Sequence, residues 1–331
     1  MLMIVLVGSY LAAAALTWLV RRYALARAVI DTPNERSLHA TPTPRGGGLA
    51  VALVVLAVHG WCVARGLLPM PAGGAWAAGA GVLAALGWLD DHRPLGATLR
   101  LGVQAVVFAV VLGAMSGVTA LPGPAALVAL GCGVLGLVWF VNLYNFMDGS
   151  DGLAGCQAVL TALLLAVLAH AHGDRGLTLG ALALAGACAG FLRFNLPPAR
   201  IFLGDVGSYF IGAWLGLYAC YLVLRGESLW PWLIVLAPFI TDASLTLGSR
   251  ILRRERWWTA HRGHAYQRLV TAGWSHGLVA TVFMLLGAPL AGTAWVAFHR
   301  PQLGPWLALS AYALTVTIWR ITIVLTSRRA A

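Results

Sequence analysis

Residues 142–155 read NLYNFMDGSDGLAG, which combines acids, amides and three glycines within 14 residues. Two side-chain amides and two carboxylates, Asn142, Asn145, Asp148 and Asp151, lie between two long apolar runs. The neighbouring glycines let the backbone turn and let a ligand approach the main chain closely. An acidic cluster beside lipid is costly unless it is solvated, paired or metal-bound, so it indicates a functional site. The alternative, a plain polar turn between two membrane helices, needs only one Gly or Asp.

The composition is that of a protein with many membrane-spanning segments. Of the 331 residues, 60% are hydrophobic and only 10% are charged, whereas soluble domains have about 25% charged residues. The net charge of +11 comes from arginine alone, because the chain contains no lysine. The arginines lie at the ends of apolar runs and form no patch with aromatic residues, which argues against nucleic acid as a partner. The five cysteines are scattered without a C-x-x-C motif, so we expect small buried hydrophobes.

Runs of about 20 mostly apolar residues can cross a bilayer as helices, and by this rule the chain contains about eleven. The fold class is therefore all-α, a polytopic membrane protein that forms a single domain over residues 1–331. The predicted transmembrane helices are 2–20, 47–67, 75–90, 99–118, 125–143, 153–171, 177–193, 207–224, 229–249, 277–297 and 305–326. Arg21 and Arg22 follow the first apolar run and no positive charge precedes it. We therefore expect an uncleaved first span with the N-terminus outside and the C-terminus cytoplasmic.

The charged residues support this orientation. The inner loops are 21–46, 91–98, 144–152, 194–206 and 250–276. Only four of the 22 arginines, Arg65, Arg175, Arg225 and Arg300, lie at or near outer ends, which leaves 18 on the inner side. This asymmetry is typical of cytoplasmic loops. The acids are also on the inner side, except Asp174, Glu227 and the membrane-embedded Asp242. The arrangement predicts a site built on loops and held by a helical scaffold.

Two inner loops suit phosphate chemistry. Residues 33–48 read PNERSLHATPTPRGGG, in which the prolines prevent a helix and the glycines expose backbone N–H groups. Arg36, His39 and Arg45 add cationic donors, so this loop predicts a phosphate site; the alternative is a rigid linker. Residues 87–96 read GWLDDHRPLG and place Asp90 beside Asp91. Adjacent carboxylates repel, so the pKa of one should be altered unless a cation neutralises them. Such a group could deprotonate or attack a phosphate, or could be solvated at a helix end.

The remaining two polar segments complete the set. Residues 202–208 read FLGDVGS and place Asp205 at a helix start, which suits a Mg²⁺ ligand, although alone the motif is weak. Residues 261–268 read HRGHAYQR, and His261, Arg262 and His264 favour binding of a diphosphate. A zinc site would need a further ligand that the loop lacks. Asp242 either supports the site from behind or pairs with an arginine of the following loop.

Magnesium-type carboxylates and phosphate donors on one membrane face indicate phosphoryl transfer involving a lipid. The five segments, in this order, resemble the polyprenyl-phosphate N-acetylhexosamine-1-phosphate transferases, glycosyltransferase family 4, over about residues 30–270. The strings PNERSLH, NFMDGSDG and HRGHAYQR are most similar to the branch that initiates O-antigen, a lipopolysaccharide component. The resemblance implies that a UDP-N-acetylamino sugar and undecaprenyl phosphate give undecaprenyl-diphospho-sugar and UMP. It also implies Mg²⁺ (or Mn²⁺) as cofactor, and a bacterial inner membrane protein whose site faces the cytoplasm.

The resemblance also implies roles for individual residues. The catalytic aspartates, which deprotonate the lipid phosphate or attack the sugar nucleotide, would be Asp90 and Asp91. The metal-side aspartates would be Asp205 and Asp148. The substrate-binding residues would be Asn142, Asn145, Asp151, His261, Arg262 and His264, together with His39 and Arg45 of the first inner loop.

The same motifs bear on three alternative functions. The closest is the phospho-N-acetylmuramoyl-pentapeptide transferase of peptidoglycan synthesis, but that enzyme has three consecutive histidines where this chain has HRGH. N-acetylglucosamine, N-acetylfucosamine and N-acetylquinovosamine all stay open as the donor sugar, and a homodimer stays open as the assembly. CDP-alcohol phosphotransferases have Ala-Arg after Asp-Gly and a later ladder of aspartates, which this chain lacks. An ion-coupled transporter would place its charges near the midplane and repeat its halves.

Overall fold

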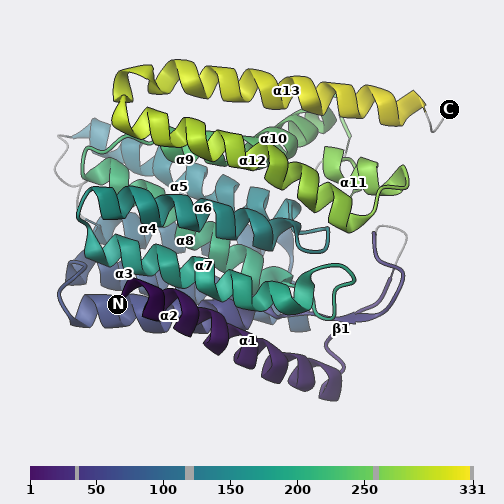
Figure 1. Ribbon diagram of the computed structural model, residues 1–331, viewed down its shortest axis with the longest axis horizontal. Coiled ribbons are helices and arrows are strands. Elements are labelled where there is room, and N and C mark those ends of the chain that lie inside the picture. Colours follow the sequence, from purple (N-terminus) through teal and green to yellow (C-terminus); the bar gives the residue numbers. More distant parts are fainter. Residues whose placement is uncertain (34–36, 116–122, 256–260, 329–331) are drawn as a thin grey trace.

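The computed structural model describes residues 1–33, 37–115, 123–255 and 261–328. It is a bundle of long helices that run roughly parallel to one another (Figure 1). The elements are α1 (Leu2–Ala26), β1 (Ile30–Asp31), β2 (Thr43–Pro44), α2 (Gly48–Ala64), α3 (Met70–His92), α4 (Ala97–Ala114), α5 (Pro124–Phe146), α6 (Leu153–Ala171), α7 (Arg175–Asn195), α8 (Gly204–Leu224), α9 (Trp230–Val235), α10 (Ala237–Leu252), α11 (Ala265–Thr271), α12 (His276–His299), the 3₁₀ turn η2 (Pro301–Leu303) and α13 (Gly304–Arg328). The strands β1 and β2 pair antiparallel, with Ile30 opposite Pro44.

Most of the predicted spans are single helices. In the described part of the chain, nine helical segments are long and apolar enough to cross a membrane. They are α1, α3, α4, α5, α6, α7, α8, α12 and the stretch Pro301–Ser327, which contains α13. The predicted span 47–67 is present as the 17-residue helix α2. In a bilayer every backbone polar group must find its partner within the protein, and helices satisfy this condition. The predicted all-α, polytopic membrane fold is confirmed.

The predicted span 229–249 is not one continuous helix. Helix α9 ends at Val235 and α10 begins at Ala237. Pro238, in the first turn of α10, has no N–H to donate to a carbonyl of the preceding turn, which interrupts the helical hydrogen bonds here. The Gln157 side chain of α6 donates a hydrogen bond to the Val235 carbonyl at 3.0 Å, so a neighbouring helix satisfies the backbone at the break.

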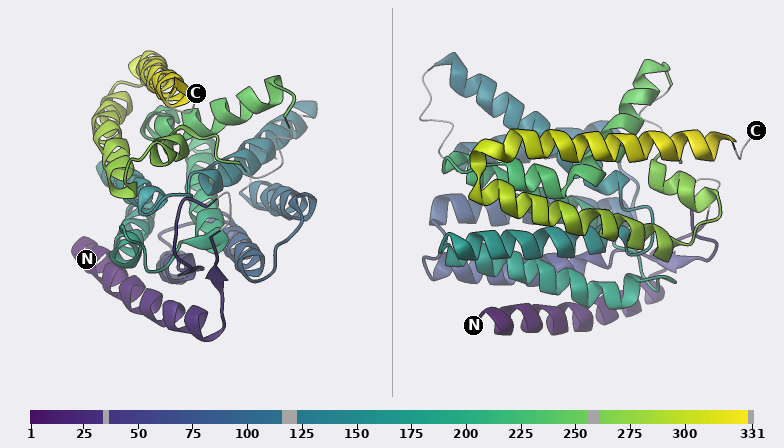
Figure 2. Two further views of the ribbon diagram at one scale, coloured as in Figure 1. Left: turned by 90° about the vertical axis from the view of Figure 1, so that its right-hand side faces the viewer. Right: turned by 45° about the horizontal axis from the view of Figure 1, so that its top comes forward.

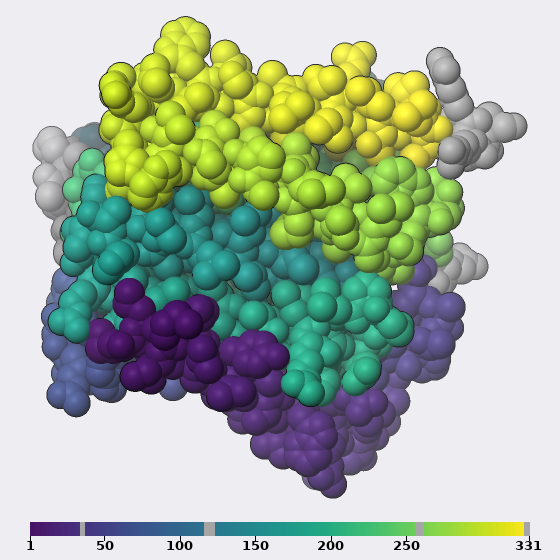
Figure 3. Space-filling view, viewed as in Figure 1, coloured from purple at the N-terminus to yellow at the C-terminus, as the bar shows by residue number. Residues whose placement is uncertain are grey.

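Helices α7 and α8 form the centre of the bundle. In their most apolar 18-residue stretches, 78% and 83% of the residues are buried, against 22% in α1, α4 and α5. Helix α8 packs against α3 and α5, and α7 packs against α1 and α6. The left view of Figure 2 looks along the bundle and shows α12 and α13 on the side opposite α1. The space-filling view shows the same separation of the C-terminal and N-terminal helices (Figure 3).

The short elements gather at one end of the bundle. Strand β1 and helix α11 lie at the right-hand end in Figure 1, and α13 ends there as well. The N-terminus lies toward the opposite end, as an odd number of crossings requires. The segments that the sequence assigned to one membrane face therefore share one end of the molecule.

One glycine sets the distance between two of the central helices. A Cβ atom at Gly87 of α3 would lie 2.3 Å from the carbonyl oxygen of Asp205, so no other residue fits there without a shift of the backbone. This close approach brings Asp91, one turn further along α3, to the first turn of α8.

Candidate active site

A cavity of about 1010 Å³ opens at the end where the polar segments gather, and all five predicted inner segments contribute to it. Ten of the twelve predicted site residues line it: His39, Arg45, Asp91, Asn142, Asn145, Asp148, Asp151, Asp205, His261 and His264. The other two, Asp90 and Arg262, do not. Ligand pockets typically measure about 300–1,000 Å³, so the cavity can hold a ligand of nucleotide size or larger.

Asp91 is fixed against the N-terminus of α8. Its carboxylate accepts the main-chain N–H groups of Asp205 at 3.0 Å and Val206 at 3.2 Å. These N–H groups belong to the first turn of a helix, where the backbone attracts negative charge. Gly204 has a φ of +76°, and a Cβ atom there would lie 2.5 Å from the Asp91 carboxylate. The guanidinium of Arg45 lies 3.8 Å away on the cavity side.

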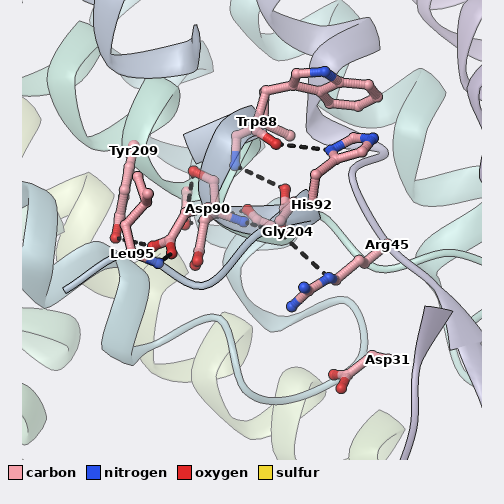
Figure 4. A network of polar contacts seen from close by, with 12 residues as sticks. Asp31, Arg45, Trp88, Asp90, His92, Leu95, Gly204 and Tyr209 are labelled. Carbon is pink, nitrogen blue, oxygen red and sulfur yellow. Dashed lines mark hydrogen bonds and ion pairs between the residues drawn. The ribbon is translucent and has the colours of Figure 1, made fainter. Parts of the chain in front are cut away.

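Asp90 has a different environment although it is the adjacent residue. It is 5% exposed, and its carboxylate accepts the N–H of Leu95 at 2.7 Å, the Arg100 guanidinium at 2.8 Å and the Tyr209 hydroxyl at 3.3 Å. Figure 4 shows Asp90 beside Leu95 and Tyr209, with Arg45 on the other side. Successive side chains on a helix point about 100° apart, which separates the two acids. Asp90 therefore holds Arg100, which itself lines the cavity.

The two amides of the opening stretch connect different helices. The side-chain N–H₂ of Asn145 donates to the Asp205 carboxylate at 2.6 Å and to the Ser208 hydroxyl at 2.9 Å. The side-chain N–H₂ of Asn142 donates to the Gln104 carbonyl oxygen of α4 at 2.7 Å. Both amides thus connect the C-terminal end of α5 to neighbouring helices, and both residues line the cavity.

Asp148 lies in the turn between α5 and α6. In the described part of the chain, no side chain or N–H group donates a hydrogen bond to its carboxylate, which lines the cavity. Burial, and then the charges of Asp205, Asp91 and Asp151, raise the pKa of Asp148 well above its ordinary value. Clustered acids favour the charged form only when a cation neutralises them, so this end of the cavity is suited to a bound cation.

The donor set fits Mg²⁺ better than a transition metal. Among the described residues, no three His, Cys, Asp or Glu side chains converge into a closed metal site. Mg²⁺ does not need one, because it is usually held by one or two carboxylates and takes the rest of its shell from water and substrate phosphates. Asp148 and Asp205 are the two carboxylates that would hold it.

Asp242 of α10 binds the backbone of the last predicted inner loop. Its carboxylate accepts the N–H groups of Ala265 at 2.8 Å and Tyr266 at 3.2 Å, at the start of α11. In the described residues its ion-pair partner is His264, at 3.6 Å, and not an arginine. Of the two alternatives for Asp242, these contacts favour support of the loop that carries His261 and His264.

The histidines of that loop are stacked at the cavity wall. The rings of His261 and His264 have centroids 5.0 Å apart. Burial, and then the charges of His264 and Arg250, lower the pKa of His261 to about 4, so it is neutral near pH 7. The Gly263 N–H donates to Nδ1 of His261 at 3.0 Å, which places the His261 proton on Nε2. His261 is therefore a neutral hydrogen-bond donor at the cavity wall.

Three residues that the sequence analysis did not single out also line the cavity: Arg100, Tyr266 and His276. The Tyr266 hydroxyl donates to the Phe146 carbonyl at 2.8 Å and accepts the Gly149 N–H at 3.1 Å, so α11 holds the turn that carries Asp148. The available signal was weak, because each is a single polar residue at the inner end of an apolar helix or in a loop. Arg36, a further donor expected in the first loop, lies outside the described residues.

Comparison with known proteins returns related sequences. The profile described as glycosyl transferase family 4 matches residues 74–223. The chain is 29% identical over 296 residues to a probable undecaprenyl-phosphate N-acetylglucosaminyl 1-phosphate transferase of Bacillus subtilis, covering 86% of this chain and 82% of that protein. It is 31% identical over 322 residues to a decaprenyl-phosphate N-acetylglucosaminephosphotransferase of Mycolicibacterium smegmatis, covering 85% and 79%. A shorter match, 37% identical over 137 residues and 39% of each chain, is to a phospho-N-acetylmuramoyl-pentapeptide-transferase of Chlamydia trachomatis.

Proposed function

Because this chain belongs to glycosyl transferase family 4, we propose that it transfers an N-acetylamino-sugar 1-phosphate from a UDP-sugar to undecaprenyl phosphate, giving undecaprenyl-diphospho-sugar and UMP. The relatives that cover most of the chain are named as transferases of this kind. The observation that carries the proposal is the cavity itself, because side chains from five separate segments meet there with the acids and donors that a diphosphate requires.

The residues of the cavity have separate tasks in this reaction. An oxygen of the lipid phosphate forms a bond to the phosphorus that carries the sugar, and the bond from that phosphorus to UMP breaks. Asp91 accepts the proton that a protonated lipid phosphate carries. Arg45 and His261 donate hydrogen bonds to phosphate oxygens. Bound Mg²⁺, held by Asp148 and Asp205, would neutralise charge on the diphosphate.

The acceptor's isoprenoid chain has an apolar wall beside this polar end. The wall is formed by α4, α5 and α10, through Leu101, Leu135, Val138, Trp139 and Leu247. The Leu135 side chain is 71% exposed on the outside of the bundle, where lipid surrounds a membrane protein. A chain attached to a phosphate in the cavity could therefore leave along α5 into the bilayer without crossing polar surface.

We further propose N-acetylglucosamine as the donor sugar, because the names of both long matches specify it. The muramoyl-pentapeptide alternative is supported only by a match over 39% of the chain. O-antigen initiation in the lipopolysaccharide pathway remains our proposal for the downstream polymer.

The site is proposed to face the cytoplasm of a bacterium from its inner membrane, on the basis of the arginine distribution. Thr271, on the site end, and Gln302, at the far end of α12, are both exposed. A membrane-impermeant thiol reagent added to intact spheroplasts should label Gln302→Cys and leave Thr271→Cys unlabelled. Labelling of Thr271→Cys alone would reverse the orientation.

The activity is tested with purified protein and a panel of UDP-sugars. UMP should be released from UDP-N-acetylglucosamine only when undecaprenyl phosphate and Mg²⁺ are both present, and a chelator should stop the release. Release of UMP without the lipid would show hydrolysis in place of transfer. Release from other UDP-amino sugars alone would reject the proposed donor and retain the reaction class.

A further inference from the structure

His276, the first residue of α12, joins three segments that are far apart in the sequence. Its Nδ1 atom lies 2.9 Å from the Ser150 hydroxyl oxygen and 3.2 Å from the Asp151 nitrogen. Its Nε2 atom lies 3.3 Å from the carbonyl oxygen of Leu38 in the first inner loop. The Ser275 hydroxyl accepts the Leu278 N–H at 3.2 Å and so caps the helix that carries the ring.

These partners determine the tautomer of His276. A main-chain N–H can only donate, so Nδ1 accepts the hydrogen bond from Asp151 and carries no proton. A carbonyl oxygen can only accept, so Nε2 carries the proton and donates to Leu38. With Nδ1 unprotonated and Nε2 protonated, the ring satisfies its three hydrogen bonds, and Nδ1, which also lies 3.8 Å from a carboxylate oxygen of Asp151, acts as the acceptor for the turn between α5 and α6.

This turn carries Asp148 and is fixed at both ends. Tyr266 binds the Gly149 N–H, His276 binds Ser150 and Asp151, and the Ala199 N–H donates to the Asp151 carboxylate at 2.9 Å. The Asp148 carboxylate receives no hydrogen bond of its own from the described residues. Its direction in the cavity therefore depends on the backbone of the turn.

We propose that His276 is a positioning residue that presets Asp148 for Mg²⁺ by accepting hydrogen bonds from Ser150 and Asp151. The proposal rests on the proposed function, which places Mg²⁺ at Asp148 and Asp205. Residues that orient metal ligands from behind typically change metal affinity or activity by about 10–100-fold when they are replaced.

The test is a Mg²⁺ titration of purified protein without substrate, read by thermal unfolding, because a ligand that binds the folded state raises the melting temperature. The His276→Phe variant removes both nitrogens and should raise the Mg²⁺ concentration at half-effect by about tenfold or more. In the transfer assay, the Mg²⁺ requirement should rise in parallel. The KM for undecaprenyl phosphate should stay nearly unchanged, since the apolar wall is formed by residues of α4, α5 and α10 and not by α12.

Two conservative variants separate the contacts of the ring. In His276→Asn the side-chain oxygen takes the place of Nδ1, so the Mg²⁺ midpoint should return to near that of the unmodified protein. In His276→Gln the polar atoms lie nearer the place of Nε2, so the contact to Leu38 is kept but the acceptor for Ser150 and Asp151 is lost. The Mg²⁺ concentration at half-effect should therefore stay raised. His299→Phe, at the other end of the same helix, is the matched control and should leave the midpoint unchanged.

A His276→Phe protein with an unchanged Mg²⁺ midpoint would overturn the role of His276 and leave the proposed function intact. The role of His276 would also be overturned if His276→Asn and His276→Gln raised the Mg²⁺ concentration at half-effect equally. If Mg²⁺ neither stabilises the unmodified protein nor supports UMP release, both proposals are overturned. The melting temperature without Mg²⁺ shows whether each variant is folded.

Discussion

The carboxylate of Asp91, near the end of α3, accepts the main-chain N–H of Asp205, at the start of α8, across 114 positions of the sequence. This bond joins two acidic motifs that the sequence places in different inner segments. It also distinguishes Asp91 from Asp90, whose carboxylate is engaged by Arg100 and Tyr209. Only Asp91 faces the cavity, so the two adjacent acids should respond differently to the same substitution.

Asp91→Asn should lower kcat by about 10²–10⁴-fold, the usual contribution of a general base. The amide keeps the size of the side chain but cannot take up a proton from the acceptor. UMP release at saturating UDP-sugar and lipid measures the effect.

Asp90→Asn is the matched comparison. It removes the charge that pairs with Arg100 at 2.8 Å, so it should lower the melting temperature more than Asp91→Asn does. Asp90→Asn should also retain a higher kcat than Asp91→Asn does. A greater loss of kcat in Asp90→Asn would exchange the roles assigned to the two residues.

Gly87→Ala should destabilise the protein, because the new methyl group would lie 2.3 Å from the backbone of Asp205. Overpacking of this kind costs typically about 1–3 kcal/mol. Gly81→Ala on the same helix meets only the Leu56 side chain, at 3.6 Å, and should be tolerated. Thermal unfolding of the two variants in detergent compares them, and equal melting temperatures would show that α3 and α8 can separate without cost.

Tyr266→Phe should reduce kcat/KM by about tenfold, because it leaves the Gly149 N–H and the Phe146 carbonyl without their partner. Tyr312→Phe is a control of the same chemistry, since its hydroxyl donates to the Leu233 carbonyl away from the cavity. Tyr312→Phe should lower the melting temperature but leave kcat/KM nearly unchanged. Full activity of Tyr266→Phe would mean that α11 does not fix the turn.

The depressed pKa of His261 predicts a pH dependence of stability. The folded protein binds this proton only near pH 4, whereas the ordinary value is 6.5. Between these values the unfolded chain binds more protons, so the stabilisation is present above about pH 6.5 and is lost as the pH falls toward 4. The melting temperature of the natural protein should therefore fall more between about pH 7 and about pH 5 than that of His261→Gln. A larger fall in His261→Gln would reverse the sign of the shift.

The sequence was sufficient to predict which segments meet. The acids are separated in the sequence by apolar runs but lie on one membrane face. Because acids are costly beside lipid, a helical bundle is expected to gather them in one polar environment. Asn145, Asp148 and Asp205 were predicted on that basis, and they line one cavity.

The sequence was not sufficient to predict which side chains face the cavity, because this depends on how a helix is rotated. It was also not sufficient to predict contacts between residues that are far apart in the sequence. Whether Asp90 or Asp91 faces the cavity depends on how α3 is rotated against α8, which Gly87 controls. Similarly, the effect of Pro238 could be recognised only once Gln157 was seen beside the break. The pKa of His261 depends on burial, which a motif does not record.

The cavity takes side chains from both Asp31 and His276, so its wall spans most of the chain. During biosynthesis the first inner loop is made long before α12 enters the membrane. When α8 has been made, the Ala199 N–H can already bind the Asp151 carboxylate, but the bonds from Tyr266 and His276 to the turn between α5 and α6 cannot yet form. Competence to bind a nucleotide sugar is acquired late, with the insertion of the final spans.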